Sequence, residues 1–138
     1  MPPQLDATQI ESRLADLVVE ISSLQLLVLA GSVVRGTATE SSDIDLGVLC
    51  IGEFDPDSLY LAIAPRLGTD RIDLVDLRRA SPLLAFEFGR SGKLLFERKP
   101  GIFRGFHSLA YRRYCDTEKL RQGRKLRIHR FLQREGLR

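Results

Sequence analysis

Hydrophobic residues recur at two different periods along the N-terminal part of the chain, and each period predicts a different element. Between residues 8 and 22 the apolar positions are spaced by threes and fours, which indicates one face of an amphipathic helix. A continuous apolar run over 24–30 follows and predicts a short buried strand. Gly31 ends this run, and Ser32 is suited to cap a short helix that reaches about Gly36.

The middle of the chain alternates further strands with helices. Two helices are each expected to begin at a capping residue followed by proline, at Asp55–Pro56 and at Ser81–Pro82. The first is expected to end near Pro65 to Gly68 and the second by Gly92. Strands are predicted where short apolar or alternating runs occur, at 43–50, 71–77 and 93–97.

After Pro100 the apolar spacing again predicts a helix. The basic residues beyond it either continue that helix or form another, since Gly123 interrupts the pattern. The order of elements is that of a small α/β (α+β) domain, in which helices flank a small mixed sheet and the C-terminus is helical. We expect one domain over 1–138, with a core over 1–100 and a basic helical extension over 101–138.

Composition excludes few classes of protein. The chain is 43% hydrophobic and 28% charged, and no apolar run approaches the roughly 20 residues of a membrane span. The N-terminus lacks the basic start and apolar centre of a signal peptide. Cys50 and Cys115 suit small buried residues in a reducing compartment. We therefore expect a cytoplasmic protein that is not associated with a membrane.

Charge is distributed unevenly. From Arg112 to the end, ten Lys and Arg residues accompany three acidic ones, a net charge of +7, whereas the first 111 residues carry −4. Such a basic tail is either a solvated helix face or a surface for nucleic acid or an acidic partner.

The segment from Gly31 to Asp45 carries the residues best suited to chemistry. A strand that ends in Gly31-Ser32 and passes into a helix presents backbone N–H groups and a hydroxyl, a site suited to phosphates. Asp43 and Asp45 lie two apart in a strand, so their carboxylates point to the same face. Two such carboxylates repel each other unless a cation lies between them, and Mg²⁺ prefers oxygen ligands of this kind.

Asp73 and Arg35 are the further candidates for this site, and Asp76 competes with Asp73. Asp73, on the later strand, would serve as a third ligand in a two-metal site or as a general base. Asp76 competes for this role, but three residues further along a strand it faces away from Asp73. Arg35 would either contact phosphate or brace the turn by pairing with a carboxylate, and the sequence leaves both interpretations open.

The pattern GSVVRGTATESSDIDLGVL resembles the signature of the DNA polymerase β-type nucleotidyltransferase superfamily, and within it the minimal (MNT) proteins. The later segments RIDLVDL and GKLLFERKP are similar to those of MntA-type antitoxins, which pair with HEPT-domain toxins. The resemblance implies a polymerase-β-like fold, with Gly31 and Ser32 holding the triphosphate of ATP. It also implies that Asp43 and Asp45 bind Mg²⁺ and that Asp73 is the third acidic residue.

The same resemblance implies an enzyme that transfers AMP from ATP to a tyrosine of a HEPT ribonuclease toxin and so silences it. Two alternatives stay open. One is a small-molecule nucleotidyltransferase similar to the aminoglycoside-modifying enzymes, although few residues remain after Pro100 for an acceptor domain. The other is a non-catalytic antitoxin that neutralises its partner by forming a complex with it. Whether the protein is a homo- or hetero-oligomer stays open.

Overall fold

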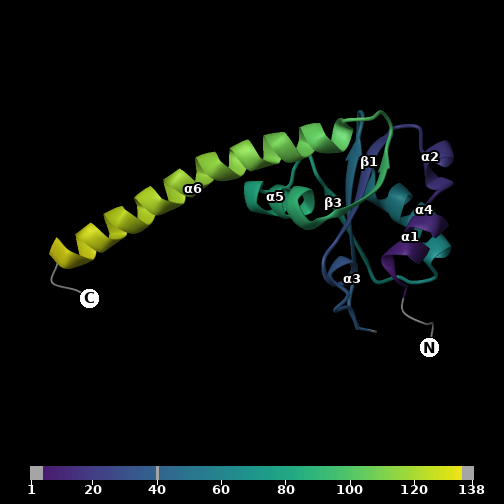
Figure 1. Cartoon of the computed structure of the whole chain (residues 1–138), viewed down its shortest axis with the longest axis horizontal. Helices are drawn as coiled ribbons and strands as arrows, with labels where there is room; N and C mark the ends of the chain where they lie inside the picture. Colours follow the sequence, from purple (N-terminus) through teal and green to yellow (C-terminus); the bar gives the residue numbers. More distant parts are fainter. Residues whose placement is uncertain (1–4, 40, 135–138) are drawn as a thin grey trace.

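The computed structural model describes residues 5–39 and 41–134 of the chain. Its elements alternate helices and strands and end in one long helix (Figure 1). The helices are α1 (Ala7–Arg13), α2 (Leu17–Glu20), α3 (Ser32–Arg35), α4 (Pro56–Leu67), α5 (Pro82–Ser91) and α6 (Ile102–Arg134). The strands are β1 (Leu24–Ala30), β2 (Ile44–Cys50), β3 (Ile72–Asp76) and β4 (Lys93–Glu97).

The four strands form one mixed sheet in the order β3-β2-β1-β4. β1 is antiparallel to both β2 and β4, while β2 and β3 are parallel. As a result β1 ends where the other three strands begin. We call this the Gly31 end of the sheet, because Gly31 directly follows β1.

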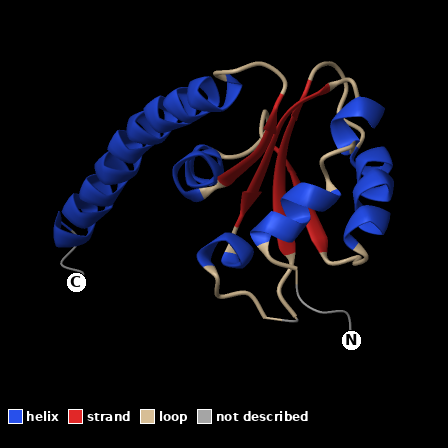
Figure 2. Ribbon diagram, turned by 45° about the vertical axis from the view of Figure 1, so that its right-hand side comes forward, coloured by secondary structure: helices blue, strands red, loops and turns tan. Residues whose placement is uncertain are grey.

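Helices cover both faces of the sheet (Figure 2). On one face, α1, α2 and α4 pack against alternate side chains of β1 and β2. The helices contribute Ile10, Leu17 and Ile63, which are fully buried. On the other face, Phe88 of α5 packs with Leu26 and Val28 of β1. The small mixed sheet flanked by helices, with a helical C-terminus, confirms the predicted fold class.

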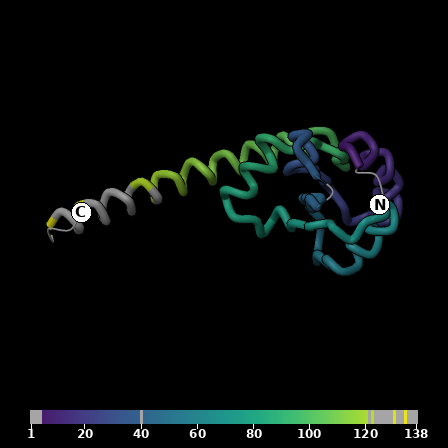
Figure 3. Tube along the Cα trace, turned by 90° about the horizontal axis from the view of Figure 1, so that it is seen from below, coloured from purple at the N-terminus to yellow at the C-terminus, as the bar shows by residue number. Residues whose placement is uncertain are grey.

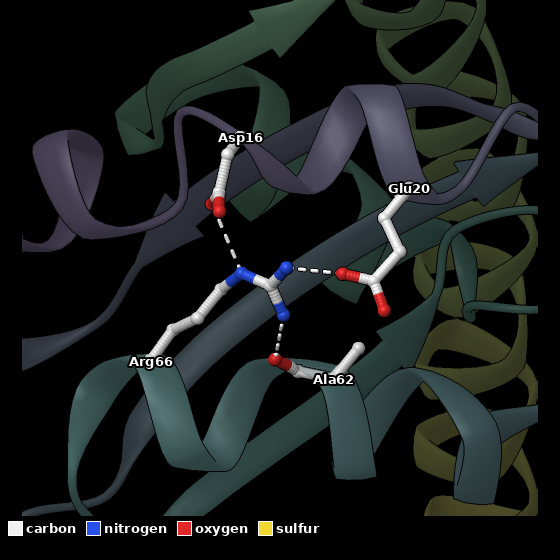
Figure 4. A network of polar contacts seen from close by, with 4 residues as sticks. All are labelled: Asp16, Glu20, Ala62 and Arg66. Carbon is white, nitrogen blue, oxygen red and sulfur yellow. Dashed lines mark hydrogen bonds and ion pairs between the residues drawn. The ribbon is translucent and has the colours of Figure 1, made fainter.

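The prediction of one N-terminal helix over 8–22 is wrong in one respect. A turn at residues 14–16 divides this segment into α1 and α2. The turn keeps Leu14 and Leu17 buried, so the apolar spacing continues through it and periodicity alone does not reveal the break. At the turn, Nε of Arg66 in α4 pairs with Asp16 at 2.9 Å, and its Nη2 pairs with Glu20 (Figure 4).

Capping at the start of α3 also differs from the prediction. The capping residue is Gly31, and Ser32 is the first residue of the helix. Gly31 has a φ of 82°, a value that glycine adopts readily and other residues rarely do. The helix ends at Gly36, which is in the left-handed conformation.

The C-terminal helix continues through Gly123 to Arg134, which settles the alternative that the sequence left open. Its first part lies over α5, and the remainder extends away from the rest of the protein (Figures 1 and 3). Among the described residues, no helix is both long and apolar enough to cross a membrane.

Candidate active site

Asp45 and Asp73 are neighbours on adjacent strands. They are direct register partners in the parallel pairing of β2 with β3. Side chains of paired residues in a sheet point to the same face, so these two carboxylates lie side by side. Gly47, two residues after Asp45, shows which face this is, since a Cβ built there would contact Phe88 of α5. Both carboxylates therefore lie on the face that α5 and α6 cover.

Asp43 lies immediately before β2 and is exposed, whereas the prediction placed it inside the strand. It still lies close enough to Asp45 to affect its ionisation. Partial burial raises the pKa of Asp45, and the negative charges of Asp73 and Asp43 raise it further. Arg35 acts on this carboxyl in the opposite direction. The structure thus brings Asp43, Asp45, Asp73 and Arg35 together at the Gly31 end of the sheet.

Gly31 is in contact with this cluster. Ala30, the residue before it, is the register partner of Asp45. A Cβ added to Gly31 would clash with Oδ2 of Asp45. The position therefore requires glycine for two reasons, its positive φ and its close approach to a site carboxylate. In this way β1 and β2 place the turn that opens α3 directly beside the aspartates.

Ser32 and Arg35 belong to α3. Ser32 is partly buried at the start of the helix, and Arg35 is exposed at its last turn. The first N–H groups of a helix have no intrahelical partner and are available to an anion. Arg35 makes no ion pair with a carboxylate among the described residues, which favours the interpretation that it contacts phosphate.

Arg71 is a residue of this region that the sequence did not single out. Its Nη1 donates to the carbonyl oxygen of Ser41 at 2.8 Å, and its own carbonyl oxygen accepts from the N–H of Ile44 at 2.9 Å. These bonds tie the start of β3 to the segment that carries Asp43. The only signal in the sequence was its position two residues before Asp73. That signal is not specific, because many arginines without such a role lie near an aspartate.

Asp76, the competing acidic residue, lies on the opposite face of β3 from Asp73. Its side chain is only 10% exposed and faces Nε of Arg78 and of Arg79, each at 3.9 Å. Its carboxylate also accepts from the backbone N–H of Arg78. These contacts give Asp76 a role in the turn after β3, away from the site carboxylates.

The donor set of the cluster consists of carboxylate oxygens, the ligands that Mg²⁺ prefers. In the part of the chain that the structure describes, no three His, Cys, Asp or Glu side chains are close enough together to hold a metal by themselves. Mg²⁺ is usually held by one or two carboxylates together with substrate phosphates, so a preformed protein cage is not needed. The residues present fit a cation that binds together with a nucleotide.

Comparison with known proteins gives the family. The family model described as "Polymerase beta, Nucleotidyltransferase" matches residues 12–101. The chain is 29% identical over 137 residues to the protein adenylyltransferase MntA of Aphanizomenon flos-aquae, with 88% of this chain and 89% of that protein covered. It is 38% identical over 96 residues to the MntA of Shewanella oneidensis, with 67% of this chain and 66% of that protein covered.

Solved structures agree with these matches. One is described as a toxin–antitoxin with AMP-PNP; a chain of it superposes with a TM-score of 0.73 at 31% identity, covering 86% of this chain and 98% of that one. Another is described as a tri-AMPylated Shewanella oneidensis HEPN toxin in complex with MNT antitoxin. The corresponding values are a TM-score of 0.67, 28% identity, and coverage of 88% and 98%.

Proposed function

The chain belongs to the polymerase β nucleotidyltransferase family, and from this premise we propose that it is a protein adenylyltransferase antitoxin. It transfers AMP from ATP to a tyrosine of a HEPT-domain (HEPN) toxin. The MntA relatives carry the name protein adenylyltransferase, and a matching complex contains an AMPylated toxin. The observation in this chain that carries the proposal is the pairing of Asp45 with Asp73 beside Gly31.

Gly31, Ser32 and Arg35 form the nucleotide side of the site. Gly31 lets the backbone approach the phosphates, and the free N–H groups and hydroxyl at the start of α3 donate to their oxygens. Arg35 adds a positive charge beside the same turn. A matching solved structure is described as a toxin–antitoxin with the ATP analogue AMP-PNP, which supports nucleotide binding by this chain.

Asp43 and Asp45 would hold Mg²⁺ together with the triphosphate, and Asp73 would serve as a third ligand or as the general base of the transfer. When bound, the cation neutralises charge on the phosphates and lowers the pKa of the acceptor hydroxyl. Their crowding supports this assignment, since burial first and then the charges of Asp73 and Asp43 raise the pKa of Asp45, and a cation would offset that repulsion.

The transfer itself exchanges one bond to phosphorus for another. The phenolic oxygen of the acceptor tyrosine forms a bond to the α-phosphorus of ATP, and the bond from that phosphorus to the pyrophosphate oxygen breaks. Asp73 takes the phenolic proton as general base, and pyrophosphate leaves with the bonding electrons. The exposed position of Asp73 allows a protein side chain to reach it from outside.

The C-terminal region bears on the small-molecule alternative. Here residues 102–134 form the single helix α6. The relatives that carry the name protein adenylyltransferase favour a protein acceptor over a small molecule. We also propose that the protein acts in the cytoplasm, where ATP is available, and its two free cysteines, Cys50 and Cys115, are compatible with a reducing compartment.

Labelled ATP tests this function. The full chain is incubated with Mg²⁺, ATP labelled at the α-phosphate, and the cognate HEPN-domain protein that the proposal names as acceptor. Label is expected on that protein, and it should be lost with EDTA and with Asp43→Ala or Asp45→Ala. An unlabelled partner in the presence of folded wild-type chain and Mg²⁺ contradicts the proposal. A chain that silences the toxin equally well without its aspartates would instead indicate the non-catalytic alternative.

A further inference from the structure

Much of α6 extends beyond the rest of the described chain (Figure 1). Its first part is fixed on α5, where the ring of Phe86 stacks on Tyr114 with the two centroids 4.3 Å apart. Beyond Tyr114, the described residues of α6 make no hydrogen bond, ion pair or ring contact with another element. The helix projects clear of the body in two perpendicular views (Figures 1 and 3). Residues 115–134 extend over about 30 Å at 1.5 Å per residue.

An isolated helix of this length is marginally stable in water, because most helical stability in proteins comes from packing. A protein that covers α6 would supply that packing. The charge of α6 indicates what kind of protein this is. The tail from Arg112 onward carries a net charge of +7. The described cations in this part of α6 are exposed, namely Arg112, Arg113, Lys119, Arg130 and Arg134. Two copies of such a helix would repel each other, whereas an acidic surface would be attracted.

A pocket lies at the base of the projecting part. It has a volume of about 410 Å³ and is lined by Phe86, Arg90, His107, Ser108 and Tyr111. The guanidinium of Arg90 lies 5.7 Å from the centroid of the Phe86 ring, and Tyr111 is 54% exposed. Aromatic walls with a cationic rim are suited to an apolar or aromatic side chain that projects from an acidic protein surface.

One wall of this pocket, Arg90, lies toward the Gly31 end of the sheet. Arg90 lies near the end of α5, two residues before Gly92, where an added Cβ would contact Val28 and Leu29 of β1. β1 then ends at Ala30, so the end of α5 lies at the Gly31 end of the sheet. The site carboxylates face the side that α5 and α6 cover. A protein that rests on α6 and fills the pocket would therefore lie beside Asp45 and Asp73.

We propose that α6 from Tyr111 onward, with the pocket between Phe86 and Tyr111 at its base, is the docking surface for an acidic acceptor protein. The proposal rests on the proposed function, which supplies the acceptor. Docking on α6 presents the acceptor hydroxyl to the carboxylates, and the 33-residue helix provides the contact area that the small core lacks. Acceptor recognition and phosphate chemistry are thereby carried by separate parts of the chain.

Charge reversal tests the surface. In the full chain, Arg112→Glu/Arg113→Glu is compared with the control Arg79→Glu/Lys99→Glu, which removes the same charge from exposed positions at the other end of the sheet. The probe is the cognate HEPN-domain protein that the proposed function names as the acceptor. We expect the α6 variant to lose about 10- to 100-fold in affinity and to raise the acceptor KM with kcat nearly unchanged. Binding of AMP-PNP with Mg²⁺ should be the same in all three proteins.

Each outcome has a distinct meaning. An α6 variant that matches the control in affinity and KM overturns the docking surface while leaving the proposed function intact. Wild-type chain that binds through α6 but transfers no AMP overturns the function while leaving the surface intact. A wild-type homodimer that Arg112→Glu/Arg113→Glu dissociates would identify a second copy as the occupant and overturn the proposal. RNA binding that the same variant abolishes would overturn it as well.

The pocket is tested without a change in charge. Tyr111→Ala removes one exposed wall, and Leu61→Ala on α4, which is 71% exposed on the opposite side of the sheet, is the control. We expect Tyr111→Ala to weaken acceptor binding about 5- to 30-fold, and Leu61→Ala to have no effect. Equal affinity of both variants for the acceptor would exclude the pocket from the docking surface.

Discussion

Asp45 of β2 and Asp73 of β3 are direct register partners on parallel strands, although 27 residues separate them in the sequence. This pairing assembles a carboxylate cluster from two segments that are distant in the sequence. It also distinguishes Asp73 from Asp76, because only a residue that shares the face of Asp45 can act with it. The first prediction follows from this distinction.

Asp73→Asn is expected to reduce AMP transfer by about 10²- to 10⁴-fold, the usual contribution of a general base. The fold should be retained, because Asp73 is exposed. Single-turnover rates with saturating ATP measure the effect. Asp76→Asn is the matched control, since it makes the same chemical change on the other face of β3 and should leave the rate of transfer within a few-fold. Similar losses in both variants would show that register does not select the catalytic residue.

Gly31→Ala is expected to impair both stability and catalysis. Alanine at a positive φ costs more than about 1 kcal/mol, and here the new Cβ would also clash with the carboxylate of Asp45. Gly36→Ala separates the two effects. Gly36 has a φ of 73°, but its added Cβ would meet nothing within 4 Å. Urea unfolding should show a loss in both variants, whereas transfer activity under folding conditions should fall only in Gly31→Ala.

Arg98 is predicted to stabilise the fold from outside the active site. Its guanidinium lies 5.1 Å from the centroid of the Phe96 ring. It also donates to a set of backbone carbonyl oxygens between α2 and β1, those of Val18, Ile21, Ser22 and Leu24. Replacing Arg98 with alanine should lower the free energy of unfolding by about 2–3 kcal/mol, because several bonds to a charged donor are lost.

Arg98→Lys is the companion variant. It keeps the charge but lacks the planar fork, so it should recover only part of the stability. Arg90→Ala, at an exposed arginine whose hydrogen bonds run only to Glu87 among the described residues, should change stability little. Urea denaturation measures all three. An Arg98→Ala variant as stable as wild type would show that these carbonyl oxygens are equally well hydrated without it.

Asp16 predicts a pH dependence of stability. Its hydrogen bond and charge pairing with Arg66 hold the pKa of Asp16 below its usual 3.8 (Figure 4). Because the folded pKa is lowered, the pair stabilises the fold fully above the unfolded pKa. That contribution is lost as pH falls through the folded pKa. Melting temperatures between pH 7 and pH 2 should fall in wild type, and less steeply below pH 4 in Asp16→Asn. Since Asp16 is exposed, the difference should be small and should shrink in high salt.

Local sequence patterns predicted most elements of the fold. The runs 24–30 and 93–97 were predicted as strands and form β1 and β4. Short apolar runs bounded by turn residues are typical of buried strands. The division of α1 from α2 was not predictable from periodicity, since it follows from contacts of Asp16 and Glu20 with Arg66, some 50 residues away. The single span of α6 through Gly123 likewise could not be decided from local propensity.

The candidate site was predictable to a different degree for each residue. The two-residue spacing of Asp43 and Asp45 was enough to predict that they lie close together. Predicting that Asp73 joins them required only that its strand pairs in register with that of Asp45. The contact between Gly31 and Asp45 was not predictable, because it depends on the antiparallel pairing of β1 with β2. Arg71 was missed because its bond to Ser41 crosses 30 residues and leaves no local pattern.

The most direct test of the account is the mass of the acceptor protein after reaction. The HEPN-domain partner is incubated with the chain, ATP and Mg²⁺, and intact-protein and peptide mass spectrometry then locate any AMP. We predict one or more added AMP groups on tyrosine with the wild-type chain, and none with Asp45→Asn, which should remain folded. An acceptor of unchanged mass after incubation with folded wild-type chain would contradict the central claim, as would equal modification by Asp45→Asn.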